Sequence, residues 1–336
     1  MTEDHDSKPE ILPTAIQNVA FRVPAGGALR IIFMGTPEFA VSSLATLVEA
    51  GYTIVGVVTA PDKPGGRGMQ MQQSAVKKYA EEKGLNILQP EKLKSSDFIT
   101  ALSELKADVQ IVVAFRMLPE IVWNMPPLGT INLHGSLLPQ YRGAAPINWA
   151  IINGEKFTGV TTFKLKHAID TGDILLQESI DIGENETAGE LHNKMKEIGA
   201  ALLLRTMEGI TTNSLTELPQ HQTFKFKNQT LLHAPKIFTE TCKIDWSKTT
   251  DEIFNLIRGL SPYPGAFTEL ENKKLKIYRA ERSAERISVD PGSYETDGKN
   301  YLRFACSDGL IYIKELQLEG KKRMRIGDFL RGYRFS

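Results

Sequence analysis

The feature that most constrains this chain is a strand, a helix and a second strand that follow one another directly. Leu29–Met34 is an apolar run with the length of a buried parallel strand. Thr36 is placed to cap the helix that follows, and Pro37 suits its first helical position. Tyr52–Thr59 then predicts the second strand. This order of elements predicts an α/β fold whose core is a parallel sheet.

The same alternation continues along the chain. Further strands are predicted at Val109–Phe115, Thr130–His134 and Val160–Lys166, the last with a hairpin partner at Asp173–Ile182. A long helix begins near Thr187, because Thr187 and Glu190 fit a T-x-x-E capping box. Its apolar residues recur at helical spacing on one face: Leu191, Met195, Ile198 and Leu202.

The pattern changes after Pro235. A helix predicted at Thr250–Arg258 precedes short strand-like segments at Ala266–Glu269, Lys274–Arg279, Tyr301–Ala305 and Leu310–Leu318. Short strands broken by Gly and Asn predict a small β-barrel. We therefore predict a mobile N-terminal tail at 1–28, an α/β domain at 29–212, a linker at 213–235 and a barrel at 236–336.

Composition excludes several classes of protein. No apolar run approaches the ~20 residues of a bilayer-spanning helix. Cys242 and Cys306 are isolated, without CxxC spacing or clustered histidines, which argues against a zinc site and against a disulfide framework. The acidic N-terminal tail lacks the apolar stretch of a secretion signal. We expect a cytoplasmic protein without a metal centre.

Two basic segments raise the question of nucleic-acid binding. The loop Ala60–Gly68 is too rich in Pro and Gly for helix or strand, and it carries Lys63 and Arg67. Near the end of the chain, cations face the single acid Asp328; they are Lys321, Lys322, Arg323, Arg325, Arg331 and Arg334. Charge alone leaves a solvated surface as the commoner explanation.

The densest group of unusual residues lies at the end of the strand Thr130–His134. Residues two apart on a strand point to the same face, so Asn132 and His134 project together. In a parallel sheet, this carboxyl edge is where ligands bind. An amide and an imidazole can both donate hydrogen bonds to a developing oxyanion. The alternative, a pair that satisfies the backbone at a strand end, is equally open on these residues alone.

A second group is the turn from His167 to Asp173. Asp170 is the natural partner for a catalytic histidine, because a carboxylate fixes the tautomer of a neighbouring imidazole. The sequence Asp-Thr-Gly also favours a plain turn. That simpler explanation holds unless Asp170 meets the first group.

Three segments together resemble the methionyl-tRNA formyltransferase family of folate-dependent formyltransferases. They are Phe33–Ala40, Asn132–Arg142 and Asp170–Gly172. The similarity runs from about Leu29 to the C-terminus, and the loop Pro61–Gly68 with the segment Ile257–Gly265 narrows it to the tRNA enzymes. The resemblance implies a Rossmann-like catalytic domain followed by an oligonucleotide-binding-like barrel that binds tRNA. Nothing in the sequence demands more than a monomer, which is the state we expect.

The resemblance also implies roles for individual residues. Asn132, His134 and Asp170 match the catalytic trio of the family, and Ser136, Leu137, Leu138 and Pro139 match its tetrahydrofolate-binding segment. Contacts with tRNA are implied for Lys63, Arg67, Lys321, Lys322 and Arg323. The implied reaction moves the formyl group of 10-formyltetrahydrofolate to the α-amine of methionyl initiator tRNA, with no metal in the chemical step.

Some positions depart from the family pattern. Arg116 and His167 stand where small residues are usual, and we expect them to reshape the mouth of the folate pocket. Gly135 replaces a common Ala. Met69–Met71 stand where lysines are frequent, and we expect the loop to bind phosphates more weakly as a result.

Three alternatives stay open at this point. A formyltransferase for a glycinamide nucleotide or an amino sugar would share the trio but would not need the 61–68 loop. An NAD oxidoreductase would need G-x-G-x-x-G, which the Gly35–Phe39 turn lacks. A non-catalytic RNA-binding protein would leave Asn132, His134 and Asp170 unexplained.

Overall fold

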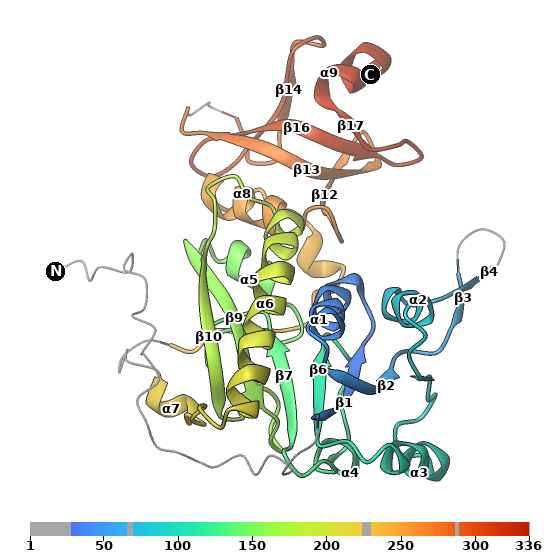
Figure 1. The fold of residues 1–336 in the computed structure, drawn as a ribbon. Helices are drawn as coiled ribbons and strands as arrows, with labels where there is room; N and C mark the ends of the chain where they lie inside the picture. Colours follow the sequence, from blue (N-terminus) through green and yellow to red (C-terminus); the bar gives the residue numbers. More distant parts are fainter. Residues whose placement is uncertain (1–27, 66–69, 224–229, 286–288, 336) are drawn as a thin grey trace. The chain divides into compact units, whose positions relative to one another are not determined.

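The computed structural model describes residues 28–65, 70–223, 230–285 and 289–335. Figure 1 follows the elements along the chain, which divides into two compact units. The first unit comprises 1–142, 159–180 and 193–232, and the second comprises 143–158, 181–192 and 233–336. Arg67 and nearly all of the predicted tail lie outside the described residues.

The first unit is built on a seven-stranded sheet with the order β10-β9-β7-β6-β1-β2-β5 (Figure 1). Its strands are β1 (Arg30–Gly35), β2 (Thr53–Val58), β5 (Ile87–Leu88), β6 (Val109–Val113), β7 (Thr130–His134), β9 (Phe157–Lys164) and β10 (Ile174–Asp181). The neighbours from β7 to β5 run parallel, whereas β9 runs antiparallel to β7. The predicted parallel-sheet, Rossmann-like fold is confirmed, and the carboxyl ends of β6 and β7 meet at one edge.

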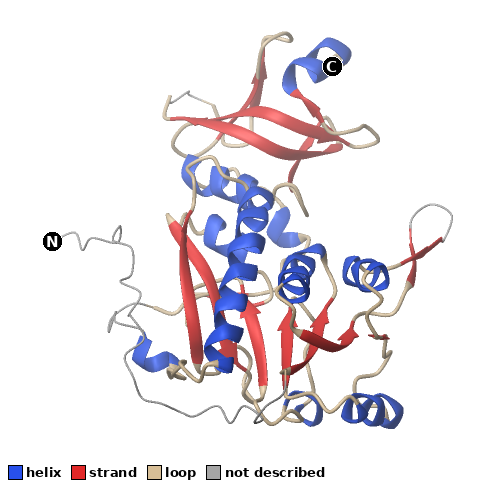
Figure 2. Cartoon of the chain, in the orientation of Figure 1, coloured by secondary structure: helices blue, strands red, loops and turns tan. Residues whose placement is uncertain are grey.

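Helices cover both faces of this sheet (Figure 2). They are α1 (Glu38–Glu49), α2 (Ala75–Glu82), α3 (Ser96–Glu104), α4 (Glu120–Trp123) and α6 (Ala188–Thr211). On one face, Met34 and Val112 pack with Phe98 of α3 and Val122 of α4. On the other, α1 and α6 lie side by side, because the Ser42 hydroxyl donates a 3.1 Å hydrogen bond to Glu197.

The predicted long helix is α6. The Glu190 amide donates to Thr187 Oγ1 at 3.3 Å, and the Thr187 amide donates to Glu190 Oε2 at 2.9 Å, so the predicted capping box is present. Leu191, Met195 and Leu202 are buried on its apolar face. A T-x-x-E signal therefore fixed where this helix begins.

The second unit contains a curled antiparallel sheet with the order β12-β13-β16-β15-β14, and β17 pairs with β16. The strands are β12 (Ala266–Leu270), β13 (Lys273–Ser283), β14 (Tyr294–Thr296), β15 (Leu302–Ala305), β16 (Leu310–Leu318) and β17 (Met324–Arg325). The helices of this unit include α5 (Pro146–Ile152), α8 (Thr250–Gly259) and α9 (Ile326–Gly332). The predicted barrel is confirmed as a half-barrel, whose core includes Phe254 of α8 and Phe329 of α9.

Two local predictions differ from the structure. Pro37 rather than Thr36 occupies the N-cap of α1, so the helix begins one residue later than predicted. The loop after β2, predicted to lack strands, contains the short hairpin of β3 (Lys63–Gly65) and β4 (Gln70–Gln72). Two short strands form there despite Pro64 because they pair only with each other.

The segment 213–235, predicted as a linker, contains α7 (Gln220–Thr223) and β11 (His233–Ala234), which pairs with β8 (Arg142–Gly143). Ile174 and Leu218 exchange backbone hydrogen bonds of 2.8 and 2.9 Å, so the segment is joined to the start of β10. The described residues of this segment, 213–223 and 230–235, therefore include regular elements that pair with other parts of the chain. None of the helices in the described ranges is long and apolar enough to cross a membrane.

Candidate active site

Asn132 and His134 lie at the end of β7, flanked by β6 on one side and β9 on the other. Asn132 is half-buried and pairs in register with Val112 and Phe163. Within the described ranges, the Asn132 side-chain amide has no hydrogen-bond partner from the protein. The amide is therefore available to a ligand at the carboxyl edge of the sheet.

His134 is held by its neighbours on two sides. The ring is only 7% exposed and meets the Phe163 ring edge-on, with the centroids 6.5 Å apart. Its Nε2 lies 2.9 Å from the carbonyl oxygen of Tyr141. Because a carbonyl can only accept, Nε2 carries the proton of this hydrogen bond. Nδ1 is therefore the ring nitrogen that is left for other partners.

Asp170 reaches His134 from a different part of the chain. Its Oδ2 lies 3.9 Å from His134 Nδ1, and its side chain is 12% exposed. This distance is longer than a hydrogen bond, so Nδ1 is not saturated by the carboxylate. The structure thus brings together the two residues that are 36 positions apart in the sequence.

The turn that carries Asp170 has an unusual backbone. Asp170 has φ +52°, in the left-handed region that Asp tolerates better than most residues. A Cβ on Gly172 would lie 1.6 Å from the carbonyl oxygen of Lys164, so only glycine lets the turn pack this closely on β9. The Asp-Thr-Gly sequence therefore both forms a turn and places the Asp170 carboxylate beside His134.

Two residues that the sequence analysis gave no role hold this turn. Gln220, 4% exposed, donates from Nε2 to the carbonyl oxygens of Asp170 at 2.8 Å and Gly172 at 2.9 Å. Arg142 donates from Nε to Gln220 Oε1 at 3.1 Å. Burial lowers the pKa of Arg142, while the charge of Asp170 raises it. Gln220 was missed because it lies in a polar stretch without a helical pattern.

The predicted folate-binding segment is largely turned inward. Ser136, Leu138 and Pro139 are buried. Ser136 Oγ donates to the Gln140 carbonyl at 2.6 Å, and Thr161 Oγ1 donates to the Ser136 carbonyl at 2.6 Å. These hydrogen bonds set the path of the loop beside His134. Leu137 is half-buried.

Two of the departures from the family pattern, Arg116 and His167, contact residues other than the trio. The Arg116 guanidinium binds the backbone carbonyls of Pro90 and Glu91, so it is committed to a neighbouring loop. The His167 side chain is 89% exposed, and its Nε2 lies 3.9 Å from Glu120. Among the described residues, no group of three His, Cys, Asp or Glu side chains could hold a metal ion.

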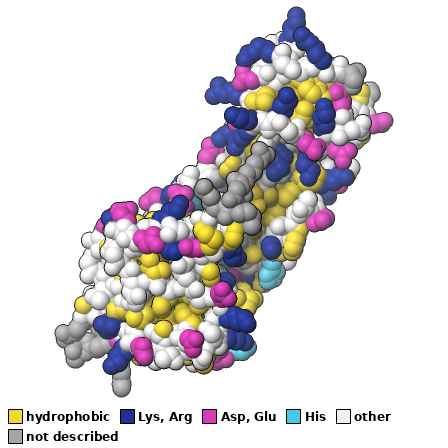
Figure 3. All heavy atoms as spheres, turned by 90° about the vertical axis from the view of Figure 1, so that its right-hand side faces the viewer, with side chains coloured by type: hydrophobic (Ala, Val, Ile, Leu, Met, Phe, Trp, Pro, Cys, Tyr) yellow, Lys and Arg dark blue, Asp and Glu magenta, His cyan; other side chains and the backbone are white. Residues whose placement is uncertain are grey.

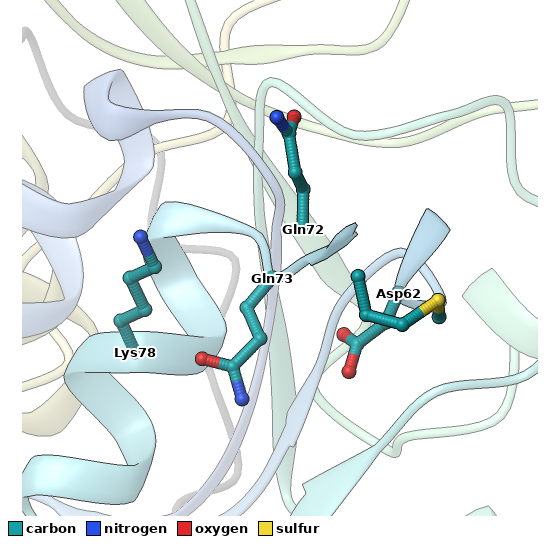
Figure 4. Close-up of a pocket in the computed structure, with 5 residues that line it drawn as sticks. Asp62, Gln72, Gln73 and Lys78 are labelled. Carbon is teal, nitrogen blue, oxygen red and sulfur yellow. The ribbon is translucent and has the colours of Figure 1, made fainter. Parts of the chain in front are cut away.

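A pocket of about 510 Å³ opens beside the β3–β4 hairpin (Figure 4). It is lined by Asp62, Met71, Gln72, Gln73 and Lys78. The Lys77 ammonium lies 2.5 Å from Asp62 and holds the pKa of that carboxyl below its usual range. Lys63 is exposed on β3 and directly follows the lining residue Asp62 in the sequence. The pocket does not include the predicted catalytic trio.

Lys and Arg side chains gather over the C-terminal unit on the face drawn in Figure 3. Lys321 and Lys322 are exposed, and neither has a carboxylate partner within the described ranges. Arg323 differs, because both its Nε and Nη2 donate to the Glu315 carboxylate at 2.7 Å and its guanidinium lies over the Tyr278 ring. Lys321 and Lys322 are therefore better placed than Arg323 to meet a phosphate.

Comparison with known proteins identifies two matching family models and several similar proteins. Residues 29–207 match the formyl transferase family model, and residues 236–334 match the model of the formyl transferase C-terminal domain. The chain is 52% identical to the methionyl-tRNA formyltransferase of Bacteroides fragilis over 313 residues, which cover 92% of this chain and 96% of the relative. It is 55% identical to that of Phocaeicola vulgatus over 314 residues, with coverage of 92% and 97%.

Solved structures show the same fold at low identity. The N-formyltransferase from Helicobacter canadensis, in complex with folinic acid and dTDP-3-aminofucose, matches with a TM-score of 0.62 at 21% identity, over 88% of this chain and all of that one. HypX from Aquifex aeolicus, in complex with tetrahydrofolic acid, matches with a TM-score of 0.61 at 18% identity, over 92% of this chain and 49% of that one. On the strength of its family matches and its closely similar relatives, the chain belongs to the formyltransferase family and, within it, to the methionyl-tRNA formyltransferases.

Proposed function

We propose that the protein transfers the formyl group of 10-formyltetrahydrofolate to the α-amine of methionyl initiator tRNA, and that Asn132, His134 and Asp170 carry out the transfer. The observation that carries the assignment of residues is the 3.9 Å approach of Asp170 Oδ2 to His134 Nδ1 at the carboxyl end of β7. The relatives at 50% identity and above carry the choice of substrates.

The reaction is an acyl transfer between two nitrogens. The lone pair of the neutral α-amine attacks the formyl carbon, so a C–N bond forms and the carbonyl oxygen gains negative charge. The bond between that carbon and folate N10 then breaks, and the electron pair returns to N10. One proton passes from the attacking amine to N10, so atoms and charge balance. Groups that stabilise the oxyanion or move this proton accelerate the transfer.

We assign each of the three residues a role in the transfer. The uncommitted Asn132 amide and a protonated His134 donate hydrogen bonds to the oxyanion. The carbonyl of Tyr141 fixes the imidazole ring from the opposite side, at Nε2. Asp170 lies on the Nδ1 side, where it supports the imidazolium and relays the amine proton through water.

The proposed function is tested by a choice of acceptors. Purified protein is given 10-formyltetrahydrofolate with charged initiator tRNA, a glycinamide nucleotide or an amino-sugar nucleotide. We expect formylation of the methionyl-tRNA and background rates with the other two acceptors. Turnover with the sugar nucleotide or the glycinamide nucleotide, and none with the tRNA, would overturn the choice of acceptor.

Lys321, Lys322 and Arg323 are proposed to bind tRNA phosphates, as are Lys63 and Arg67, of which Arg67 lies outside the described residues. Replacing both Lys321 and Lys322 by Gln should weaken tRNA binding and leave folate binding unchanged. A plot of log affinity against log salt concentration has a negative slope. Its magnitude should decrease by about 0.7–0.9 for each phosphate that the variant no longer neutralises. Filter binding at several salt concentrations measures this slope. Lys92→Gln, an exposed lysine outside the C-terminal unit, is the matched control, and equal slopes in all three proteins would contradict the assignment.

A further inference from the structure

The residues of the candidate active site are connected in a closed cycle. Hydrogen bonds form most of the cycle, and the short distance between the Asp170 carboxylate and His134 completes it. His134 Nε2 binds the carbonyl of Tyr141, and the next residue, Arg142, donates to Gln220 Oε1. Gln220 Nε2 in turn binds the carbonyl of Asp170, whose carboxylate lies beside His134 Nδ1. Each side of the imidazole is thus connected to the other through Arg142 and Gln220.

Only a neutral amide fits the place of Gln220. Its oxygen accepts two hydrogen bonds from Arg142, at 3.1 and 2.5 Å, while its nitrogen donates to two backbone carbonyls, at 2.8 and 2.9 Å. A glutamate at position 220 could accept from Arg142 but could not donate to carbonyls. A methionine has a similar length and could do neither. The side chain is 4% exposed, so water is a poor substitute for these hydrogen bonds.

The two carbonyl groups that Gln220 binds lie in the turn directly after the Cα atom of Asp170. They belong to Asp170 itself and to Gly172, so the intervening peptide units are fixed at both ends. Asp170 has φ +52°, a conformation that its surroundings must maintain. The direction of the Asp170 carboxylate therefore depends on a side chain 50 residues further along the sequence.

We propose that Gln220, together with Arg142, is a positioning residue for formyl transfer: it holds the 170–172 turn so that the Asp170 carboxylate stays beside His134. The role rests on the proposed function, in which Asp170 supports the imidazolium. The Gln220 side chain is 4% exposed and its amide binds Arg142 and the 170–172 turn, so we expect it to act from behind the site. Its effect on the reaction passes through Asp170 alone.

The test uses Gln220→Met and Gln220→Glu in the full-length protein, with Gln222→Met as the matched control, since Gln222 is exposed on the same helix. We expect kcat for formylation of methionyl initiator tRNA to fall about tenfold to a hundredfold in both Gln220 variants, because small displacements of catalytic groups cost this much. KM for folate and tRNA should stay within about threefold, since the binding surfaces are intact. Gln222→Met should match the wild type.

A double variant separates positioning from general damage to the fold. In an Asp170→Asn background, Gln220→Met should cost less than about threefold more, because the carboxylate that it positions is gone. An unchanged kcat in Gln220→Met, or a full second loss in the Asp170→Asn background, would overturn the proposal.

A crystal structure of Gln220→Met gives a readout that does not depend on the acceptor. A carboxylate displaced from His134 supports the proposal, and a carboxylate in its original place contradicts it. If the wild-type protein formylates another acceptor, the proposed function fails while this structural test still decides the role of Gln220.

Discussion

Replacing His134 by alanine should lower kcat for formyl transfer by about 10²–10³-fold, which corresponds to about 2.7–4 kcal/mol of lost transition-state stabilisation. The ring is 7% exposed, and its Nε2 is fixed by the Tyr141 carbonyl, so in the proposed mechanism Nδ1 is the preorganised donor to the oxyanion. Alanine removes that donor and leaves the Asn132 amide as the remaining one. Steady-state formylation of methionyl initiator tRNA at saturating 10-formyltetrahydrofolate measures the loss.

The matched control for this variant is His167→Ala. The His167 side chain is 89% exposed and lies beside Glu120, so its removal changes the histidine content, and any effect at the mouth of the folate pocket should appear in KM and not in kcat. We expect His167→Ala to keep the wild-type kcat, and both variants to show cooperative thermal unfolding. A His134→Ala protein that turns over at the wild-type rate would exclude the imidazole from the chemistry.

Replacing Asp170 by asparagine should lower kcat by about 10²–10⁴-fold, the range of a general acid–base contribution. Asparagine has nearly the same shape and, like aspartate, tolerates the left-handed backbone at φ +52°. The hydrogen bond that Gln220 donates here goes to the Asp170 backbone, so the turn keeps its support. The substitution therefore removes the negative charge beside His134, which also acts on Arg142, and keeps the backbone of the turn. Single-turnover formylation measures the chemical step directly.

Asp173→Asn is the control for this second variant. Asp173 lies three positions along the same turn, but its carboxylate binds the Lys166 ammonium at 2.6 Å. We expect Asp173→Asn to stay within about threefold of the wild-type kcat, since a partly exposed ion pair contributes little. Loss of turnover in Asp173→Asn with none in Asp170→Asn would reverse the assignment of the two carboxylates.

The sequence predicted those parts of the fold that local patterns determine. The predicted strand Thr130–His134 coincides with β7, where polar and apolar residues alternate as they do along a β-strand. The start of α6 followed from the Thr187 and Glu190 capping box, whose hydrogen bonds are present. Thr249 and Glu252 form the same box at the start of α8, a signal that the prediction of this helix did not use. An element whose position is determined by the residues of one helical turn or one strand can therefore be predicted from the sequence.

The parts that sequence reasoning missed depend on contacts between distant positions. Gln220 lies 50 residues from Asp170 and 78 from Arg142, and nothing local marks its polar surroundings as part of a site. Arg323 was grouped with the other C-terminal cations, although the structure pairs it with Glu315 across a strand pair of the half-barrel. Such pairings follow from the assembled sheet, which the spacing of charges along the chain does not reveal.

The most direct measurement of whether His134 and Asp170 form one catalytic unit is the single-turnover rate of formyl transfer to methionyl initiator tRNA in the double variant His134→Ala/Asp170→Asn. Residues that act as a unit lose little more when both are changed than when one is. We expect the double variant to react within about threefold of the slower single variant. A rate reduced by the product of the two single losses would show that the imidazole and the carboxylate act independently.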